Sequence, residues 1–182
     1  MRTFLQILGI LILIPAVALL TIKIDKQNGD GPSIVFPGGV FTSGELHQGP
    51  EPDWRFTDDI PVIELLLEEQ GTSRRIFIME SDGRIYLPSG YMRSFLGQIW
   101  KEWAIQADEG NGLAVLRING VLYERQLKRI TAGPELEGVV TKMAQKYGGG
   151  ASPEVITESL ESVTNGDLWL FEVAPRGAAN ES

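Results

Sequence analysis

Two short groups of residues have the chemistry to bind an anion. Arg74 and Arg75 stand together at the entrance of a predicted strand, where a guanidinium can make two parallel hydrogen bonds to a phosphate. Ser89-Gly90-Tyr91 lies where a strand is expected to give way to a helix, and free N–H groups and a hydroxyl at such a junction favour negative charge. Both groups also fit simpler roles: a hydrated edge or an ion pair for the arginines, and an N-cap for the serine.

Aromatic residues form a second set of candidates. Trp100 and Trp103 are three positions apart on a predicted helix that also carries Lys101, so the two rings share a face, which we interpret as part of the core. Trp54 stands in a predicted loop. It could cover a flat ligand or plug the end of a barrel.

Composition excludes several kinds of site. The chain has no cysteine and one histidine, His47, which excludes disulfides, thiolate catalysis and ordinary zinc sites, so no metal is expected. Gly148-Gly149-Gly150 lacks the Lys-Ser/Thr of a phosphate-binding loop and is typical of a linker. The formal net charge is -8, and because no dense Lys/Arg cluster is present, we do not expect nucleic-acid binding.

Hydrophobic periodicity predicts an α+β domain that is rich in hairpins. Asp82-Gly83 and Asn119-Gly120 are tight-turn signals between strands. Strands are expected at 61–69, 75–80, 84–87, 113–118, 121–130 and 167–174, after a short extended stretch at 40–46, and helices at 91–107, 135–147 and 153–162. Residues 64–68 could also be helical. Such local antiparallel pairing favours a Greek-key or meander barrel with packed helices over a parallel doubly wound sheet.

An apolar segment at residues 4–22 precedes the domain. As a helix, its roughly 19 residues would span about 28 Å, close to the hydrocarbon thickness of a bilayer. Ala16-Val17-Ala18 has the form of a signal-peptide cleavage site, so a cleaved signal is the main alternative and a buried soluble helix the third. The apolar run continues past that site to Ile22, which favours an uncleaved anchor in the lipid bilayer. The short amino-terminal tail favours a domain on the non-cytoplasmic side.

These observations predict one soluble domain held by a single-pass anchor. The expected boundaries are an anchor at 1–26, a Gly/Pro-rich tether at 27–37, the soluble domain at 38–176 and a disordered tail at 177–182. The domain is long enough to bury one hydrophobic core.

An ordered series of segments resembles a known family. Its leading part, Gly38-Gly39, Gly44-Glu45-Leu46 and Asp53-Trp54-Arg55-Phe56, is similar to small membrane-anchored bacterial proteins related to the nitroreductase/quinone-reductase group. Residues 76–87, 116–124 and 146–147 resemble the split β-barrel proteins that bind flavin mononucleotide (FMN) or deazaflavin, with the fold of pyridoxamine-phosphate oxidase. Residues 98–103 stand where deazaflavin reductases carry a Pro-x-Trp and Asn-Leu pattern. The likeness covers residues 38–147.

The resemblance implies an antiparallel split β-barrel with packed helices, often a homodimer, and a cofactor phosphate near the second strand pair. Carried over by position, the cofactor-binding residues are Arg74, Arg75, Ser89, Gly90, Trp100 and Lys101, while no catalytic residue is assigned. The implied function is a flavin- or deazaflavin-dependent oxidoreductase at the bacterial inner membrane that reduces a quinone-like or other lipophilic small molecule. Since the cofactor supplies the redox chemistry, no catalytic His or Cys is needed. A non-enzymatic split-barrel module and a lipocalin-like ligand carrier remain as alternatives.

Overall fold

The computed structural model describes residues 12–15, 17–18, 21, 29–34, 36–95, 97 and 101–177. Within this part of the chain, no helix is long and apolar enough to cross a membrane. Most of the anchor predicted at residues 4–22 lies outside the described residues, as do Trp100 and nearly all of the predicted tail.

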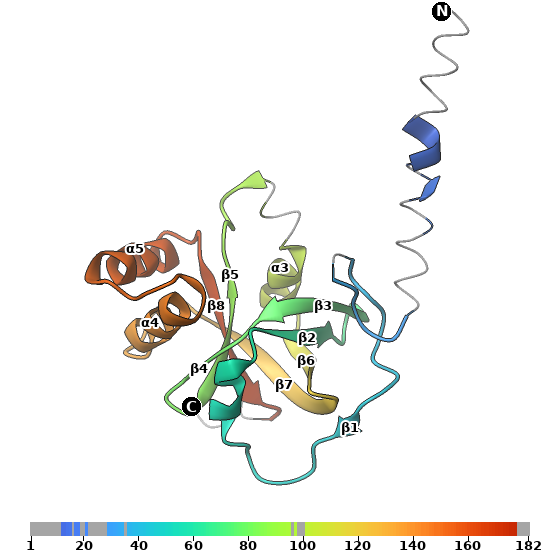
Figure 1. Ribbon diagram of the computed structural model, residues 1–182, viewed down its shortest axis with the longest axis horizontal. Coiled ribbons are helices and arrows are strands. Elements are labelled where there is room, and N and C mark those ends of the chain that lie inside the picture. Colours follow the sequence, from blue (N-terminus) through green and yellow to red (C-terminus); the bar gives the residue numbers. More distant parts are fainter. Residues whose placement is uncertain are drawn as a thin grey trace, which may run out of the picture.

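A single sheet of eight strands dominates the domain (Figure 1). The strands are β1 (Glu45–Leu46), β2 (Val62–Leu67), β3 (Thr72–Phe77), β4 (Met79–Ser81), β5 (Arg84–Ser89), β6 (Leu113–Ile118), β7 (Val121–Ile130) and β8 (Trp169–Pro175). Their order is β3-β2-β6-β7-β8-β5-β4, and each pair of neighbours is antiparallel. β1 lies off this path and pairs in parallel with β7.

The sheet curls because its two edge strands are joined through one residue, Ile78. β3 ends at Phe77 and β4 begins at Met79, yet β3 pairs with β2 at one edge and β4 with β5 at the other. Two Cα–Cα steps reach at most roughly 7.6 Å, so the edges must come together there. The result is a curled antiparallel half-barrel. The strand expected at 75–80 is therefore two strands, since the segment changes partners at Ile78.

Three helices pack against this half-barrel (Figure 1). They are α3 (Glu102–Glu109), α4 (Leu136–Tyr147) and α5 (Pro153–Thr164), and a 3-10 helix, η1 (Trp54–Asp59), precedes β2. α3 buries Trp103, Ala104 and Ala107 in the main core. α4 and α5 cover the outside of β4, β5 and β8 and form a second core there. The helices expected at 135–147 and 153–162 are confirmed. A longer helix was expected at 91–107. Of this range, the structure describes α3 from Glu102 onward.

Alternate residues of the strands fill the interior of the half-barrel. Leu65, Leu67, Leu116 and Phe171 belong to the main core and are almost completely buried. This period of two is what a strand with one face in a core requires. The interior is therefore packed with side chains, and a ligand site has to be sought at its ends.

The carboxyl end of α4 holds the break at Ile78 in place. Ile78 lies between the two strand ladders, so its N–H and C=O need partners from elsewhere. The Ile78 N–H donates to the Tyr147 hydroxyl at 3.1 Å, and this hydroxyl lies 2.5 Å from the Ile78 carbonyl oxygen. Lys146 Nζ donates to the same carbonyl and to two carbonyls at the end of η1, at 2.7 to 2.8 Å. We call Lys146 and Tyr147 the latch.

Candidate functional site

Two partly buried cations, Arg74 and Lys101, interact electrostatically at the α3 end of the half-barrel. Arg74 lies opposite Leu65 in the β2–β3 register, and because Leu65 faces the interior, so does Arg74. Lys101 stands at the N-cap of α3. Neither forms an ion pair with any residue that the structure describes. The exposed Glu102 favours the charged form of Arg74 only from a distance.

The electrostatics of this pair favour a bound anion. Burial lowers the pKa of Arg74, and burial together with repulsion from Arg74 lowers the pKa of Lys101. Arg74 Nε is buried and has no hydrogen-bond partner among the described residues. Two like charges with little solvation, and a buried N–H without an acceptor, each raise the free energy of the folded state. An anion beside the two side chains would relieve both costs.

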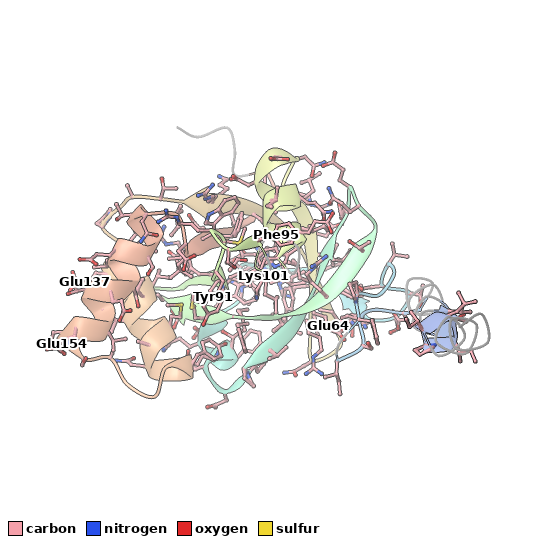
Figure 2. All side chains as sticks on the ribbon, turned by 90° about the horizontal axis from the view of Figure 1, so that it is seen from above. Glu64, Tyr91, Phe95, Lys101, Glu137 and Glu154 are labelled. Atoms are coloured by element: carbon pink, nitrogen blue, oxygen red, sulfur yellow. The ribbon has the colours of Figure 1, made fainter. Side chains whose placement is uncertain are left out.

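Exposed aromatic rings lie over the same end of the domain. Tyr91 is 73% exposed and Phe95 is 77% exposed, and both belong to the segment that leads from the end of β5 to Lys101 at the start of α3 (Figure 2). The φ angle of Tyr91 is 62°, in the left-handed region that bulky side chains rarely adopt. The turn is tight as well, since a Cβ on Gly97 would lie 1.8 Å from the Tyr91 carbonyl oxygen. A constrained turn therefore holds two large rings in solvent.

Ser89 and Gly90 lie at the end of β5, and nearby polar groups already have partners. The Ser89 hydroxyl is buried and lies 3.2 Å from the Met92 sulfur. The N–H groups of Met92 and Arg93 donate to the backbone carbonyl and the carboxylate of Asp167, at 2.9 and 3.3 Å. A carboxylate of the protein thus occupies part of the place where an anion was expected.

The remaining predicted site residues are placed differently. Arg75 is exposed on the outer face of β3, because neighbouring residues of a strand point to opposite faces. Trp100 lies outside the described residues. Of the residues predicted to bind the cofactor, Arg74 and Lys101 are the two whose charges influence each other in the structure.

A further charged group was missed by sequence reasoning and lies beside η1, at the lower end of the half-barrel in Figure 1. Arg125 is 5% exposed, and its guanidinium lies 4.8 Å from the centre of the Trp54 ring. Glu51 joins the two, accepting from Trp54 Nε1 at 2.6 Å and from Arg125 at 2.8 Å. Trp54 is 1% exposed and plugs this end. The available signal was an arginine between Tyr123 and Leu127, at an inward-facing position of β7.

The fold is an α+β half-barrel with two partly buried cations, Arg74 and Lys101, at one end. No protein-family model matches the sequence, and no curated protein matches it either. Among solved structures, the conserved hypothetical protein Rv2991 from Mycobacterium tuberculosis is similar at 13% identity and a TM-score of 0.48, over 72% of this chain and 83% of that chain. A likeness of that size carries no argument, so the functional conclusion rests on the residues themselves.

Proposed function

We propose that the chain is a membrane-tethered oxidoreductase that binds FMN or a deazaflavin at Arg74 and Lys101. Its acceptor would be a quinone-like or other lipophilic molecule. The observation that carries the proposal is the pair itself: two partly buried cations without an ion-pair partner in the described residues, one of them with a buried N–H that lacks an acceptor. The phosphate of such a cofactor is the kind of group that relieves this arrangement.

Each residue of the site has a separate task in this proposal. The Arg74 guanidinium and the Lys101 ammonium hold the phosphate, while Tyr91 and Phe95 offer apolar rings to a flat heterocycle at the same end. The bound cofactor supplies the redox chemistry, and the protein binds and orients it. The curled sheet that closes at Ile78 supports the finer fold assignment, a split β-barrel.

A second candidate is a non-enzymatic barrel module held at the membrane. The observation in its favour is Asp167, which engages the N–H groups of Met92 and Arg93 where a cofactor phosphate was expected. The filled interior weighs against a lipocalin-like carrier, since such proteins hold their ligand inside the barrel.

A titration of the full chain with FMN and with a deazaflavin tests the proposal. The variants are Arg74→Gln and Lys101→Gln, and the matched control is Arg75→Gln, whose side chain points outward from the same strand. A hydrogen bond to a charged group contributes about 1.5–3 kcal/mol, so each site variant should bind roughly 10- to 100-fold more weakly. The control should bind like the wild type.

Absorbance and fluorescence of the cofactor report the affinity. If neither cofactor binds the wild type, the oxidoreductase is wrong and the non-enzymatic module takes its place. If all three variants bind as the wild type does, the cofactor lies elsewhere and the Arg74–Lys101 assignment is wrong.

A further inference from the structure

The segment between β5 and α3 is fixed to the half-barrel near its beginning. The N–H groups of Met92 and Arg93 donate to the backbone carbonyl and the carboxylate of Asp167, at 2.9 and 3.3 Å. The Met92 side chain is buried in the main core. The segment therefore starts from a defined position, although Tyr91 and Arg93 themselves are exposed.

Ser94 closes the next turn with its backbone and its side chain. Its N–H and its hydroxyl both donate to the Tyr91 carbonyl, at 3.1 and 2.9 Å. The hydroxyl also accepts from the Gly97 N–H at 2.9 Å. A serine that accepts from the N–H three positions further on has the contacts of a helix N-cap. Because Ser94 is exposed, its side chain contributes to the turn through these hydrogen bonds and not through packing in a core.

Gly97 connects this turn to Lys101. The Gly97 carbonyl accepts from the Lys101 N–H at 2.7 Å, and the Lys101 carbonyl accepts from the Ala104 N–H at 2.9 Å at the start of α3. A Cβ on Gly97 would lie 1.8 Å from the Tyr91 carbonyl oxygen and 2.6 Å from Ser94 Oγ, so the turn leaves no room there. Lys101 is an N-cap with non-helical backbone angles, so α3 alone does not set the direction from which the chain reaches it.

We propose that Ser94 is a positioning residue for the anion site at Arg74 and Lys101. Its hydroxyl holds the Tyr91 carbonyl and the Gly97 N–H together, and the Gly97 carbonyl in turn holds the backbone of Lys101. A ligand-binding group that is held in place before the ligand arrives loses less entropy on binding. The inference rests on the proposed function, in which the Lys101 ammonium binds the cofactor phosphate, and Ser94 acts through Lys101.

Three variants of the full chain isolate the Ser94 hydroxyl. Ser94→Ala removes it, and Ser94→Thr keeps a hydroxyl at the same position. The matched control is Ser152→Ala, because Ser152 is an exposed N-cap serine of α5 that accepts from the Val155 N–H at 3.4 Å. α5 packs on the second core and carries no residue of the proposed site. All three variants should fold, since neither serine belongs to a core.

The first measurement is the pKa of Lys101, by NMR titration without cofactor. Burial and repulsion from Arg74 lower this pKa in the wild type. When the turn opens, Lys101 gains solvent and is no longer held beside Arg74. Ser94→Ala should therefore raise the pKa toward 10.5, while Ser94→Thr and Ser152→Ala leave it at the wild-type value. A pKa that does not rise in Ser94→Ala, or that rises equally in either of the other variants, overturns the inference.

The second measurement, a titration with FMN, separates this inference from the proposed function. The contribution of an N-cap serine predicts that Ser94→Ala binds FMN about 3- to 10-fold more weakly. The other two variants should bind like the wild type. If the wild type binds neither FMN nor a deazaflavin but the pKa of Lys101 responds as expected, the positioning role is confirmed and the oxidoreductase is wrong. If the wild type binds FMN and Ser94→Ala binds it equally well, the positioning role is wrong and the proposed function stands.

Discussion

Removal of the Lys146 ammonium tests whether α4 closes the half-barrel. The Nζ atom donates to the carbonyls of Thr57, Ile60 and Ile78 at 2.7 to 2.8 Å, which joins η1, the Ile78 break and the end of α4. Hydrogen bonds to charged groups contribute about 1.5–3 kcal/mol each, but these three share one ammonium group, so their contributions do not simply add. Since Thr57 and Ile78 are fully buried, their carbonyls lose a partner in the variant, and we expect Lys146→Met to lower the free energy of unfolding by roughly 2–4 kcal/mol.

Tyr147→Phe removes the other half of the latch and keeps the ring. The ring remains in contact with Phe77, whose centre lies 4.7 Å away, while the N–H of the fully buried Ile78 loses its partner. A buried donor left without an acceptor costs about 1–3 kcal/mol. Because both latch residues contact the Ile78 carbonyl, the cost of the double variant should differ from the sum of the single costs.

Urea unfolding measured by tryptophan fluorescence gives these free energies. Lys142→Met is the matched control, since Lys142 lies on the same helix but makes a partly exposed ion pair with Asp58, for which less than about 1 kcal/mol is expected. If Lys146→Met costs no more than the control, the latch does not hold the break and the reasoning is refuted. A cost below about 0.5 kcal/mol for Tyr147→Phe would refute it as well.

Three further changes test the site and the elements around it. Arg74→Gln removes a neighbouring positive charge, so the lowered pKa of Lys101 should rise toward its ordinary value of 10.5 in an NMR titration; no change would place the two side chains too far apart to interact. Hydrogen bonds from Ser43 and Thr42 and the charge of Arg117 hold the pKa of Asp30 well below its ordinary 3.8, so its stabilisation of the docked loop is complete above pH 3.8 and is lost progressively as the pH falls below it. Hydrogen exchange of residues 29–43 should accelerate in that acidic range, and Asp30→Asn should abolish this pH dependence. Gly97→Ala would put a methyl group against the Tyr91 carbonyl and should destabilise the turn by about 1–3 kcal/mol, detected as faster exchange of Ser94, whose N–H bonds that carbonyl.

Local sequence patterns were sufficient to predict most of the strands, turns and helices. The Asp82-Gly83 turn joins β4 and β5, and Asn119-Gly120 joins β6 and β7, as the turn signals predicted. α4 and α5 begin and end within two residues of the predicted bounds, because their apolar periodicity and flanking glycines are local information. The short turn between β2 and β3 was not predicted, since the strand was expected to continue to residue 69, whereas β2 ends at Leu67.

The candidate site at Arg74 and Lys101 could not be predicted from any single segment of the sequence. Strand periodicity requires Arg74 and Arg75 to face opposite sides, but only the pairing of Arg74 with Leu65 decides which one faces inward. Lys101 is the N-cap of α3, and its electrostatic interaction with Arg74 links two segments that are far apart in the sequence. Ser89 was expected to bind an anion, and in the structure its hydroxyl is buried against Met92, a contact that the sequence order alone does not reveal.

The sequence by itself determined an α+β domain of antiparallel hairpins, an apolar amino-terminal segment, and the exclusion of cysteine and zinc chemistry, because each follows from composition or from contacts between neighbours in the chain. Only the tertiary structure decided where the strand at 75–80 breaks, which arginine faces the interior, and that Arg74 and Lys101 influence each other electrostatically. The physical reason is that one short segment can contribute both edge strands of a sheet only when the sheet curls and brings its edges together. That curl is fixed by contacts between distant residues, such as Lys146 and Tyr147 with Ile78.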